Sequence, residues 1–377
     1  MLNLQLITQI LFILFCIDIA VQIFYYLYFF TRLAYHKIPQ ETEEENINLP
    51  MSIIVCARDE ATKLAQNLPG VLVQHHKANT EVIIVNDNSV DETKYILDEF
   101  KKSFNNINHI ELRQEAMLIS GKKFPLSVGI KSAKYETLLL TDADCVPASE
   151  FWVDKMQAAY ANSNIEIVLG YGAYHKKAGL LNKLIRFETY HTALQYFSYA
   201  LAGVPYMGIG RNLSYKRDVF IRNKGFASIN NILSGDDDLF INKIANKTNT
   251  AIVIDKDAHT LSEPKKTWGS WIKQKSRHYT TSKYYKPLHK FLLSWYSLSL
   301  FLVYPLLVLS IIFFNWWLVL AVFAVRFFIQ LSVHTKAMKK LNEADLIPHF
   351  LLLDVWMFFY YILFFFALFK RPSKTWK

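Results

Sequence analysis

The order of apolar and polar positions divides the chain into an apolar first segment, a mixed middle part and an apolar end. Residues 6–30 form an almost unbroken apolar run that carries one charge, Asp18. Because about 20 apolar residues suffice to cross the ~30 Å hydrocarbon core of a bilayer, the run predicts a transmembrane helix within a first segment at 1–35. It is too long for a signal peptide and lacks a cationic start. Basic residues between Arg32 and Lys37 follow it, which predicts that this end lies in the cytoplasm.

From residue 49 to residue 264 short apolar runs alternate with amphipathic segments, a pattern typical of a mostly parallel α/β domain. Helices are expected after the first two strands, at 59–74 and 91–100. Since ligands bind at the carboxyl ends of parallel strands, polar residues at strand ends are the first candidates for a site. The predicted strands are 51–57, 81–85, 109–112, 137–141, 165–171 and 251–255.

Residues 179–202 repeat large apolar side chains at three- and four-residue steps, which predicts an amphipathic helix. Two positions for this helix fit the pattern equally well. Its wide aromatic face could lie in the lipid headgroup region, or the helix could be buried in the protein core.

The last third of the chain is first basic and aromatic and then apolar. Residues 265–290 contain eight Lys or Arg and no acidic residue, mixed with Trp and Tyr. This mixture suits anionic lipid headgroups or single-stranded nucleic acid, and the adjoining apolar runs favour the membrane and argue against nucleic acid. A C-terminal membrane segment is expected at 291–371, with two spans in 291–335 that turn near Asn315 and a fourth candidate span at 350–369.

The topology of the last span is open. With the α/β domain in the cytoplasm, four complete crossings would leave the C-terminal basic residues outside, against the positive-inside rule; these are Lys370, Arg371, Lys374 and Lys377. A re-entrant or interfacial last segment would remove the conflict. Arg326 lies inside the third run and Asp354 inside the fourth. The Arg326 charge either serves a function, such as facing an acceptor path, or snorkels to the interface.

Composition supports a multi-pass protein of the cytoplasmic (inner) membrane. The 377 residues are 52% hydrophobic and 15% aromatic, and the formal net charge is +10. A positive charge beside apolar runs favours anionic lipid as the partner. The three cysteines have no framework spacing, which indicates a reducing compartment and no metal–thiolate site.

The clearest candidate chemistry follows the strand at 137–141, which ends in Asp142-Ala143-Asp144. Hard divalent cations take oxygen ligands and are often shared with substrate phosphates. The pair therefore predicts a site that holds Mg²⁺ or Mn²⁺ against a diphosphate. The alternative is a pair of turn or cap residues, because residues 146–150 read as the start of a helix.

The order of these features resembles the family 2 glycosyltransferases of GT-A (Rossmann-like) fold, within the group of cellulose, hyaluronan and poly-N-acetylglucosamine synthases. The resemblance covers roughly residues 50–280. It implies a hexosyl- or N-acetylhexosaminyl-transferase whose Asp142 and Asp144 bind the metal, with Asp144 the more direct ligand. It implies a nucleotide-sugar site, preferably for a UDP-sugar, formed by Ala57, Arg58, Glu60, Asp87, Gly121, Lys122, Asp142, Arg211, Asn212, Gln274 and Arg277.

The resemblance also implies a base that takes the proton of an attacking acceptor hydroxyl. Alignment on Gly235 assigns this role to Asp237, whereas alignment on the downstream Asp-Leu pair assigns it to Asp236. Helix-capping acidic residues are the alternative for this cluster. His278 stands where the family's Gln-x-x-Arg-Trp motif has a tryptophan that stacks on the acceptor sugar, which argues against extension of a long polymer.

We therefore expect a membrane-bound, metal-dependent and inverting glycosyltransferase that uses a lipid or lipid-linked acceptor. Two alternatives stay open. One is the catalytic subunit of a processive polysaccharide synthase, and the other is a non-catalytic membrane subunit that binds nucleotide sugars. The donor sugar, the acceptor, the linkage and the oligomeric state do not follow from the sequence.

Overall fold

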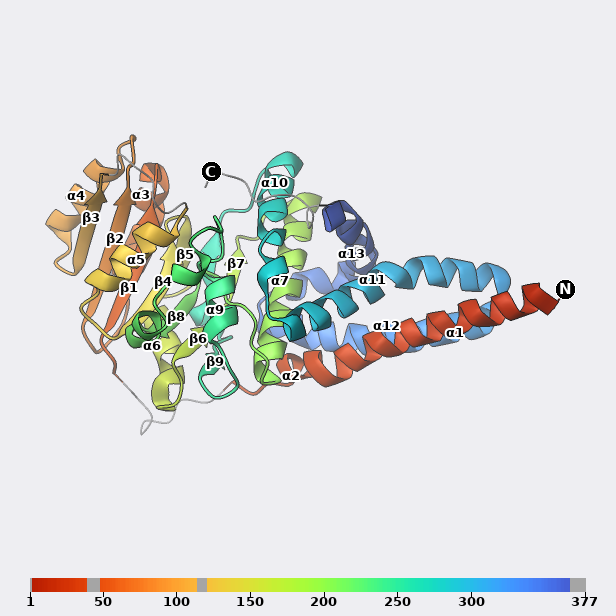
Figure 1. Cartoon of the computed structure of the whole chain (residues 1–377). Helices are drawn as coiled ribbons and strands as arrows, with labels where there is room; N and C mark the ends of the chain where they lie inside the picture. Colours follow the sequence, from red (N-terminus) through yellow and green to blue (C-terminus); the bar gives the residue numbers. More distant parts are fainter. Residues whose placement is uncertain (1, 39–47, 114–120, 367–377) are drawn as a thin grey trace.

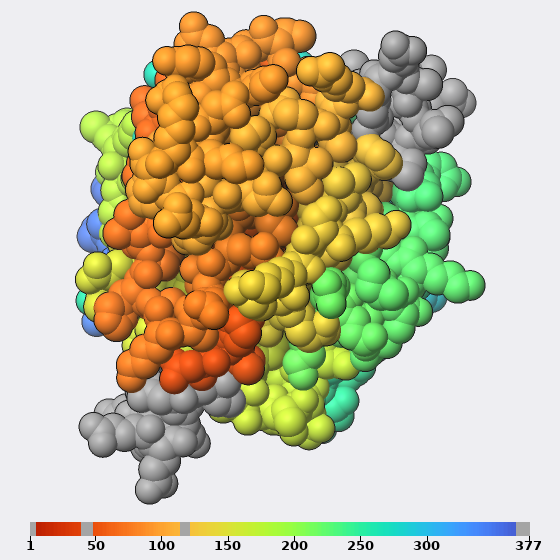
Figure 2. All heavy atoms as spheres, turned by 90° about the vertical axis from the view of Figure 1, so that its left-hand side faces the viewer, coloured from red at the N-terminus to blue at the C-terminus, as the bar shows by residue number. Residues whose placement is uncertain are grey.

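The computed structural model describes residues 2–38, 48–113 and 121–366 and consists of a sheet domain joined to a long helical bundle (Figure 1). Most of the polar stretch at 40–48 and the C-terminal basic residues from Lys370 onward lie outside the described residues. Figure 2 views the sheet end, where β1 to α4 (orange) and α5 (yellow) cover most of the face.

The main sheet has seven strands in the order β3-β2-β1-β4-β8-β6-β9. The pairs β4–β8 and β8–β6 are antiparallel and the other neighbours are parallel, so the sheet is mostly parallel, as predicted. The strands are β1 (Met51–Ala57), β2 (Thr80–Asp87), β3 (Ile107–Leu112), β4 (Thr137–Asp142), β6 (Ile167–Leu169), β8 (Leu213–Lys216) and β9 (Thr250–Ile252).

The central strands are buried on both faces because helices cover both sides. All seven residues of β1 and the first five of β4 are buried, in keeping with near-continuous apolar runs in parallel sheets. The surrounding helices are α3 (Ala61–Leu72), α4 (Thr93–Ser103), α5 (Lys123–Ser132), α6 (Trp152–Gln157), α8 (Arg217–Arg222) and α9 (Asp238–Ile244).

A second sheet of three short strands, in the order β5-β10-β7, lies beside the main one. Its members are β5 (Cys145–Pro147), β7 (Gly172–Tyr174) and β10 (Thr260–Ser262). The expected helix start at 146–150 is therefore wrong. Those residues begin in a strand because β10, more than a hundred residues later, supplies an antiparallel partner, and the helix begins at Trp152.

Within the part of the chain that the structure describes, the bundle contains four helices that are long and apolar enough to cross a membrane, at 5–34, 287–313, 316–340 and 344–365. The first is α1 (Leu2–Phe24), which continues through a π-helical turn (Tyr25–Phe30) into α2 (Thr31–Ala34). Next come α11 (Pro287–Phe313) and α12 (Trp316–Lys340), and the chain turns between them near Asn315, as the sequence predicted. The Asn315 side chain also caps α12. Helix α13 (Phe350–Phe365) is the last.

Helix α13 differs from the other three. It follows a 3₁₀ turn (Ala344–His349), and the two together form the described part of this span. In Figure 1, α1, α11 and α12 run together away from the sheet domain, whereas α13 lies at the near end of the bundle. The re-entrant or interfacial alternative for the last segment stays a prediction.

The two charged residues within the apolar runs, Arg326 and Asp354, are partners in one buried ion pair. Arg326 is fully buried and its guanidinium forms an ion pair with the Asp354 carboxylate, with Nη1 at 2.6 Å from Oδ2. Neither residue lines the large cleft described below. The interpretations of Arg326 as a residue of an acceptor path or as a snorkelling side chain are therefore both wrong, because its charge is neutralised inside the bundle by a partner on the next helix.

Helices α7 (Leu180–Leu201) and α10 (Trp268–Tyr279) join the two parts of the molecule (Figure 1). Helix α7 contacts β7 and β9 on one side and α2 and α13 on the other. Most of its residues are buried. Of the two positions considered for this helix, the structure has the buried one: its aromatic stripe packs against protein.

Candidate functional site

One large cleft, with a volume of about 1790 Å³, begins at the carboxyl edge of β1 and β4 and ends among α11 and α13. Single-ligand pockets typically measure roughly 300–1,000 Å³, so the cleft has room for two ligands. Its two ends differ in chemistry. Arg58, Asp142, Asp144 and Asp237 line the first end, and Leu298, Phe301, Phe358 and Phe364 line the second.

At the polar end, the first two strands place a charged pair where they finish. The Arg58 guanidinium lies 3.7 Å from the Asp87 carboxylate. Burial raises the pKa of the Asp87 carboxyl, and the Arg58 charge partly offsets this shift. Arg58 and Glu60 line the cleft, whereas Asp87 and Ala57 do not; Asp87 is linked to the cleft through its ion pair with Arg58.

The acidic pair lies on the cleft wall with a lysine on each carboxylate. The Lys122 ammonium donates to Asp142, and the Lys63 ammonium lies 3.9 Å from Asp144. Burial opposes ionisation of Asp142, but the adjacent Lys122 charge holds its pKa below the usual value. For Asp144, burial and the neighbouring Asp142 charge raise the pKa. A metal cation bound here, in addition to the Lys63 ammonium, would therefore stabilise the ionised form of the Asp144 carboxylate.

The donor atoms around this pair fit a hard divalent cation. Oxygen atoms of Asp142 and Asp144 and the Sγ of Cys145 all lie within 4.8 Å of one another. The Cys145 thiol is at hydrogen-bond distance from the Ser262 hydroxyl, 2.9 Å away. The carboxylates thus provide the oxygen ligands that Mg²⁺ and Mn²⁺ prefer, with Asp144 less tightly held by the protein than Asp142.

The acidic cluster that follows Gly235 begins α9. Gly235 has a φ of +102°, a backbone conformation that favours glycine, and it turns the chain into the helix. The Asp237 side chain accepts hydrogen bonds from the backbone N–H groups of Asp238 (2.7 Å) and Gly210 (2.8 Å). Burial, together with the charges of Asp236 and Asp238, raises the pKa of Asp237 to about 7.

The three acidic residues have different surroundings. The Asp238 carboxylate accepts hydrogen bonds from the hydroxyls of Thr281 (2.5 Å) and Tyr285 (2.7 Å), so it ties α9 to the segment after α10. All three aspartates line the cleft, but only Asp238 is held by these two hydroxyls. The capping interpretation holds for Asp237, whose side chain caps α9, but capping leaves its position on the cleft wall unexplained.

The structure separates two neighbouring residues that the resemblance had grouped. Arg211 lines the cleft, and its guanidinium lies 4.4 Å from the centre of the Tyr174 ring. The Asn212 amide is buried and fully used inside the domain: it donates to the carbonyls of Tyr171 (3.0 Å) and Ala258 (2.7 Å) and accepts from Trp152. We therefore assign Asn212 a structural role instead of a donor-binding one.

Gly121 contributes to the site through its backbone conformation. It has a φ of +80°, and a Cβ at this position would collide with the carbonyl oxygen of Leu233. Its role is to let the chain turn closely beside that loop, so that Lys122 reaches Asp142.

Helix α10 adds the third wall of the cleft, which Gln274, Arg277 and His278 line. Burial and the charges of Lys275, Arg277 and Arg211 lower the pKa of His278 well below its ordinary value, so its ring is neutral.

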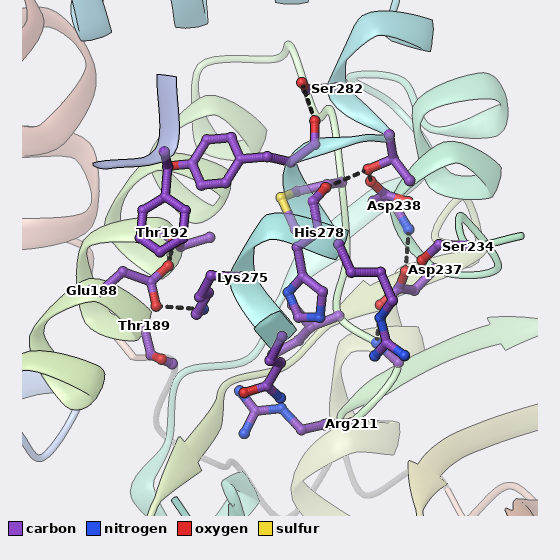
Figure 3. Close-up of a pocket in the computed structure, with 18 of the residues that line it drawn as sticks. Glu188, Thr189, Thr192, Arg211, Ser234, Asp237, Asp238, Lys275, His278 and Ser282 are labelled. Carbon is purple, nitrogen blue, oxygen red and sulfur yellow. Dashed lines mark hydrogen bonds and ion pairs between the residues drawn. The ribbon is translucent and has the colours of Figure 1, made fainter. Parts of the chain in front are cut away.

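Lys275, grouped above with the lipid-facing cations, is buried and forms an ion pair with Glu188 of α7 (Figure 3). Glu188 could not be recognised from the sequence, because a lone acidic residue in an amphipathic helix usually faces water.

Comparison with known proteins identifies the family and the fold of the sheet domain. The sequence model of glycosyl transferase family 2 matches residues 52–222, from the start of β1 to the end of α8. The chain contains a family 2 glycosyltransferase domain. A mannosyltransferase from Pyrobaculum calidifontis, solved with GDP-Man and Mn²⁺, superposes with a TM-score of 0.59 at 16% identity, over 93% of this chain and 99% of that one. This likeness shows the GT-A fold.

Two curated relatives are similar over shorter stretches. A poly-β-1,6-N-acetyl-D-glucosamine synthase from Staphylococcus epidermidis is 26% identical over 163 residues, 43% of this chain and 38% of that protein. A β-monoglucosyldiacylglycerol synthase from a Nostoc species is 33% identical over 103 residues, 26% of this chain and 21% of that protein. The matches thus span about a fifth to two fifths of the relatives' length. The domain is related to both polysaccharide and glycolipid synthases.

Proposed function

We propose that this chain transfers a sugar from a nucleotide-diphosphate sugar to a hydroxyl group of a membrane lipid. The observation that carries the proposal is the continuity of the cleft. One cavity reaches from the carboxylates of Asp142 and Asp237 to the apolar side chains of Leu298 and Phe358 on α11 and α13. A water-soluble donor can enter the polar end while an acyl chain lies along the apolar end.

The polar end supports donor binding. The cations of Lys122, Arg211 and Arg277 line it, and such charges stabilise a diphosphate both when it is bound and as it departs. Asp142 and Asp144 would hold Mg²⁺ or Mn²⁺, which supplies further positive charge against the diphosphate. Asp87 favours uridine through the family resemblance, and the Pyrobaculum neighbour was solved with GDP-Man, so both nucleotides belong in the test.

The acidic cluster supports the transfer step. An acceptor hydroxyl attacks the anomeric carbon from the face opposite the diphosphate, the bond to the diphosphate breaks, and the hydroxyl proton passes to the Asp237 carboxylate. A raised pKa of about 7 suits a base at neutral pH. The backbone donors from Gly210 and Asp238 fix the carboxylate in place. A single displacement of this kind inverts the anomeric configuration.

A single addition to lipid fits better than polymerisation. His278 replaces the tryptophan that the resembling synthases use to stack the acceptor sugar. The alternative, a processive polysaccharide synthase, is favoured by the similarity to the Staphylococcus protein. We place the chain in the cytoplasmic membrane with its sheet domain facing the cytoplasm.

The test uses purified full-length protein in detergent with Mg²⁺ or Mn²⁺, UDP- and GDP-sugars, and extracted lipids. Release of nucleoside diphosphate together with one lipid that gains one sugar mass supports the proposal. Products that gain many sugars contradict it in favour of the polymerase alternative. Nucleotide binding without release or transfer, for every donor, contradicts enzymatic activity.

A further inference from the structure

A buried polar site lies in the cleft on a different wall from the acidic cluster. Glu188 of α7 and Lys275 of α10 form an ion pair, and their side chains are 6% and 10% exposed. Both line the cleft. In the view of Figure 3 they lie on one side of His278, with Asp237 and Asp238 on the other. An ion pair at this depth is costly to desolvate, and it adds a polar patch to a wall that continues into apolar side chains.

Two hydroxyl groups extend this polar patch along Glu188. The Thr192 hydroxyl donates to Glu188 Oε1 at 3.2 Å, and the Tyr360 hydroxyl of α13 donates to the same atom at 3.3 Å. The Glu188 carboxylate is thereby held by three elements, α7, α10 and α13. This arrangement keeps the side chain at the junction of the sheet domain and the bundle.

Thr189 provides the observation that points to a ligand. It is 7% exposed and lines the cleft. Its hydroxyl has no hydrogen-bond partner among the residues that the structure describes. Since a buried hydroxyl without a partner costs roughly 1–3 kcal/mol, such groups are uncommon. A ligand hydroxyl in the cleft would provide the missing partner.

The local charge indicates the class of headgroup. The charges of Glu188 and Lys275 cancel, and the Glu188 carboxylate would repel a phosphate placed beside it. Together the patch presents a carboxylate that accepts hydrogen bonds, an ammonium that donates them and a hydroxyl that does both. These groups match the hydroxyls of an uncharged polyol, such as a glycerol or sugar headgroup.

We infer that Glu188, Thr189 and Lys275 form a binding site for the uncharged, hydroxyl-bearing headgroup of the lipid acceptor. This inference rests on the proposed function and specifies the substrate class of the same cleft. The headgroup lies beside the ion pair, its acyl chains follow α11 and α13, and one of its hydroxyls points to Asp237.

The first experiment compares Thr189→Val with Ser198→Ala in the full-length protein. Ser198 is a matched control, because it lies on the same helix, is fully buried, has an unpartnered hydroxyl among the described residues and does not line the cleft. Loss of either hydroxyl should leave the melting temperature unchanged or raise it. Thr189→Val should raise the KM for diacylglycerol about threefold to tenfold relative to the KM for the donor, the range of one hydrogen bond. Equal KM values in the two variants would overturn the inference.

The second experiment tests charge selectivity with diacylglycerol, a monohexosyl-diacylglycerol and the anionic phosphatidylglycerol as acceptors. Glu188→Gln leaves the Lys275 charge uncompensated, so it should shift the preference from neutral to anionic lipid by about tenfold or more. Glu99→Gln is the control, since Glu99 pairs with Lys102 on the exposed surface of α4. An unchanged preference in Glu188→Gln would overturn the inference.

The outcomes separate this inference from the proposed function. Transfer by the wild type to phosphatidylglycerol alone would overturn the headgroup assignment and leave lipid transfer standing. Transfer to none of the three lipids, with sugar passing instead to a growing glycan, would overturn both.

Discussion

The guanidinium of Arg326 and the carboxylate of Asp354 meet in a two-point ion pair, with Nη1–Oδ2 and Nη2–Oδ1 distances of 2.6 and 3.2 Å. Gln22 accepts from Arg326 Nε at 2.8 Å, and Gln330 and Tyr304 donate to Asp354. The network joins the first, second, third and last of the four membrane-type helices. We infer that it fixes how these helices pack, and hence where the apolar end of the cleft lies.

Removal of one partner should destabilise the bundle. Arg326→Met leaves the Asp354 charge buried and unpaired, which is expected to cost about 3–5 kcal/mol in the free energy of unfolding. Replacement of both residues, as Arg326→Met with Asp354→Leu, should recover part of this loss because no charge remains. Thermal unfolding in detergent measures both, with exposed Lys131→Met as the control. A double variant less stable than the single one would contradict the account.

Lys123 should position the loop that carries the base. It is fully buried, and its ammonium donates to the backbone carbonyls of Ile229 (3.0 Å), Ile232 and Ser234 (2.7 Å). Lys123→Met frees this loop just before Asp237, so kcat should fall by about tenfold or more while donor binding changes less. Lys131→Met, an exposed lysine on the same helix, should match the wild type. A folded Lys123→Met variant that transfers sugar with the wild-type kcat would contradict this role.

Transfer should require a divalent cation. Chelation should abolish sugar transfer, and Mn²⁺ or Mg²⁺ should restore it, because the charges of Lys63, at 3.9 Å, and Arg211 offset the Asp144 carboxylate only in part. Asp144→Asn should weaken metal binding by about 10–100-fold, as judged by the Mn²⁺ concentration that gives half-maximal rate. Full activity in the presence of chelator would contradict the metal requirement and would show that lysine and arginine side chains alone stabilise the departing diphosphate.

The rate of transfer should rise with pH through neutrality. The pKa of Asp237 is raised to about 7 by burial and by Asp236 and Asp238. Below that value the carboxyl is protonated and cannot accept a proton, so kcat should increase between roughly pH 6 and 8 and then level off. Asp236→Asn removes a neighbouring negative charge and should move the midpoint to lower pH. An unchanged pH midpoint of kcat in Asp236→Asn would contradict the effect of the Asp236 charge on the pKa of Asp237.

The parts of the fold that depend on local pattern could be predicted from the sequence. The apolar strands β1, β2 and β4, the two long spans around Asn315 and helix α7 all stand within a few residues of their expected positions. The short strands β5, β7 and β10 could not, because each has three residues and exists through pairing with a distant segment. An aromatic stripe such as that of α7 does not reveal whether its partner is lipid or protein.

The same distinction applies to the site. Asp142, Asp144 and Asp237 follow recognisable patterns, and the cleft brings them together. The buried positions of Lys123 and Glu188 had no sequence signal, since their partners are backbone carbonyls of a distant loop and a lysine on another helix. Asn212 is the opposite case: it belongs to a recognisable motif, but its buried amide hydrogen-bonds other parts of the domain instead of facing the cleft.

The most direct test compares wild type, Asp237→Asn and Asp236→Asn for nucleoside diphosphate release and for lipid mass. We expect wild type to add one sugar to one lipid, and Asp237→Asn to bind the donor with a similar affinity but to transfer at least about 100-fold more slowly. Asp236→Asn should retain measurable transfer. Full activity of Asp237→Asn, or a wild-type product that is a polymer free of lipid, would contradict the account.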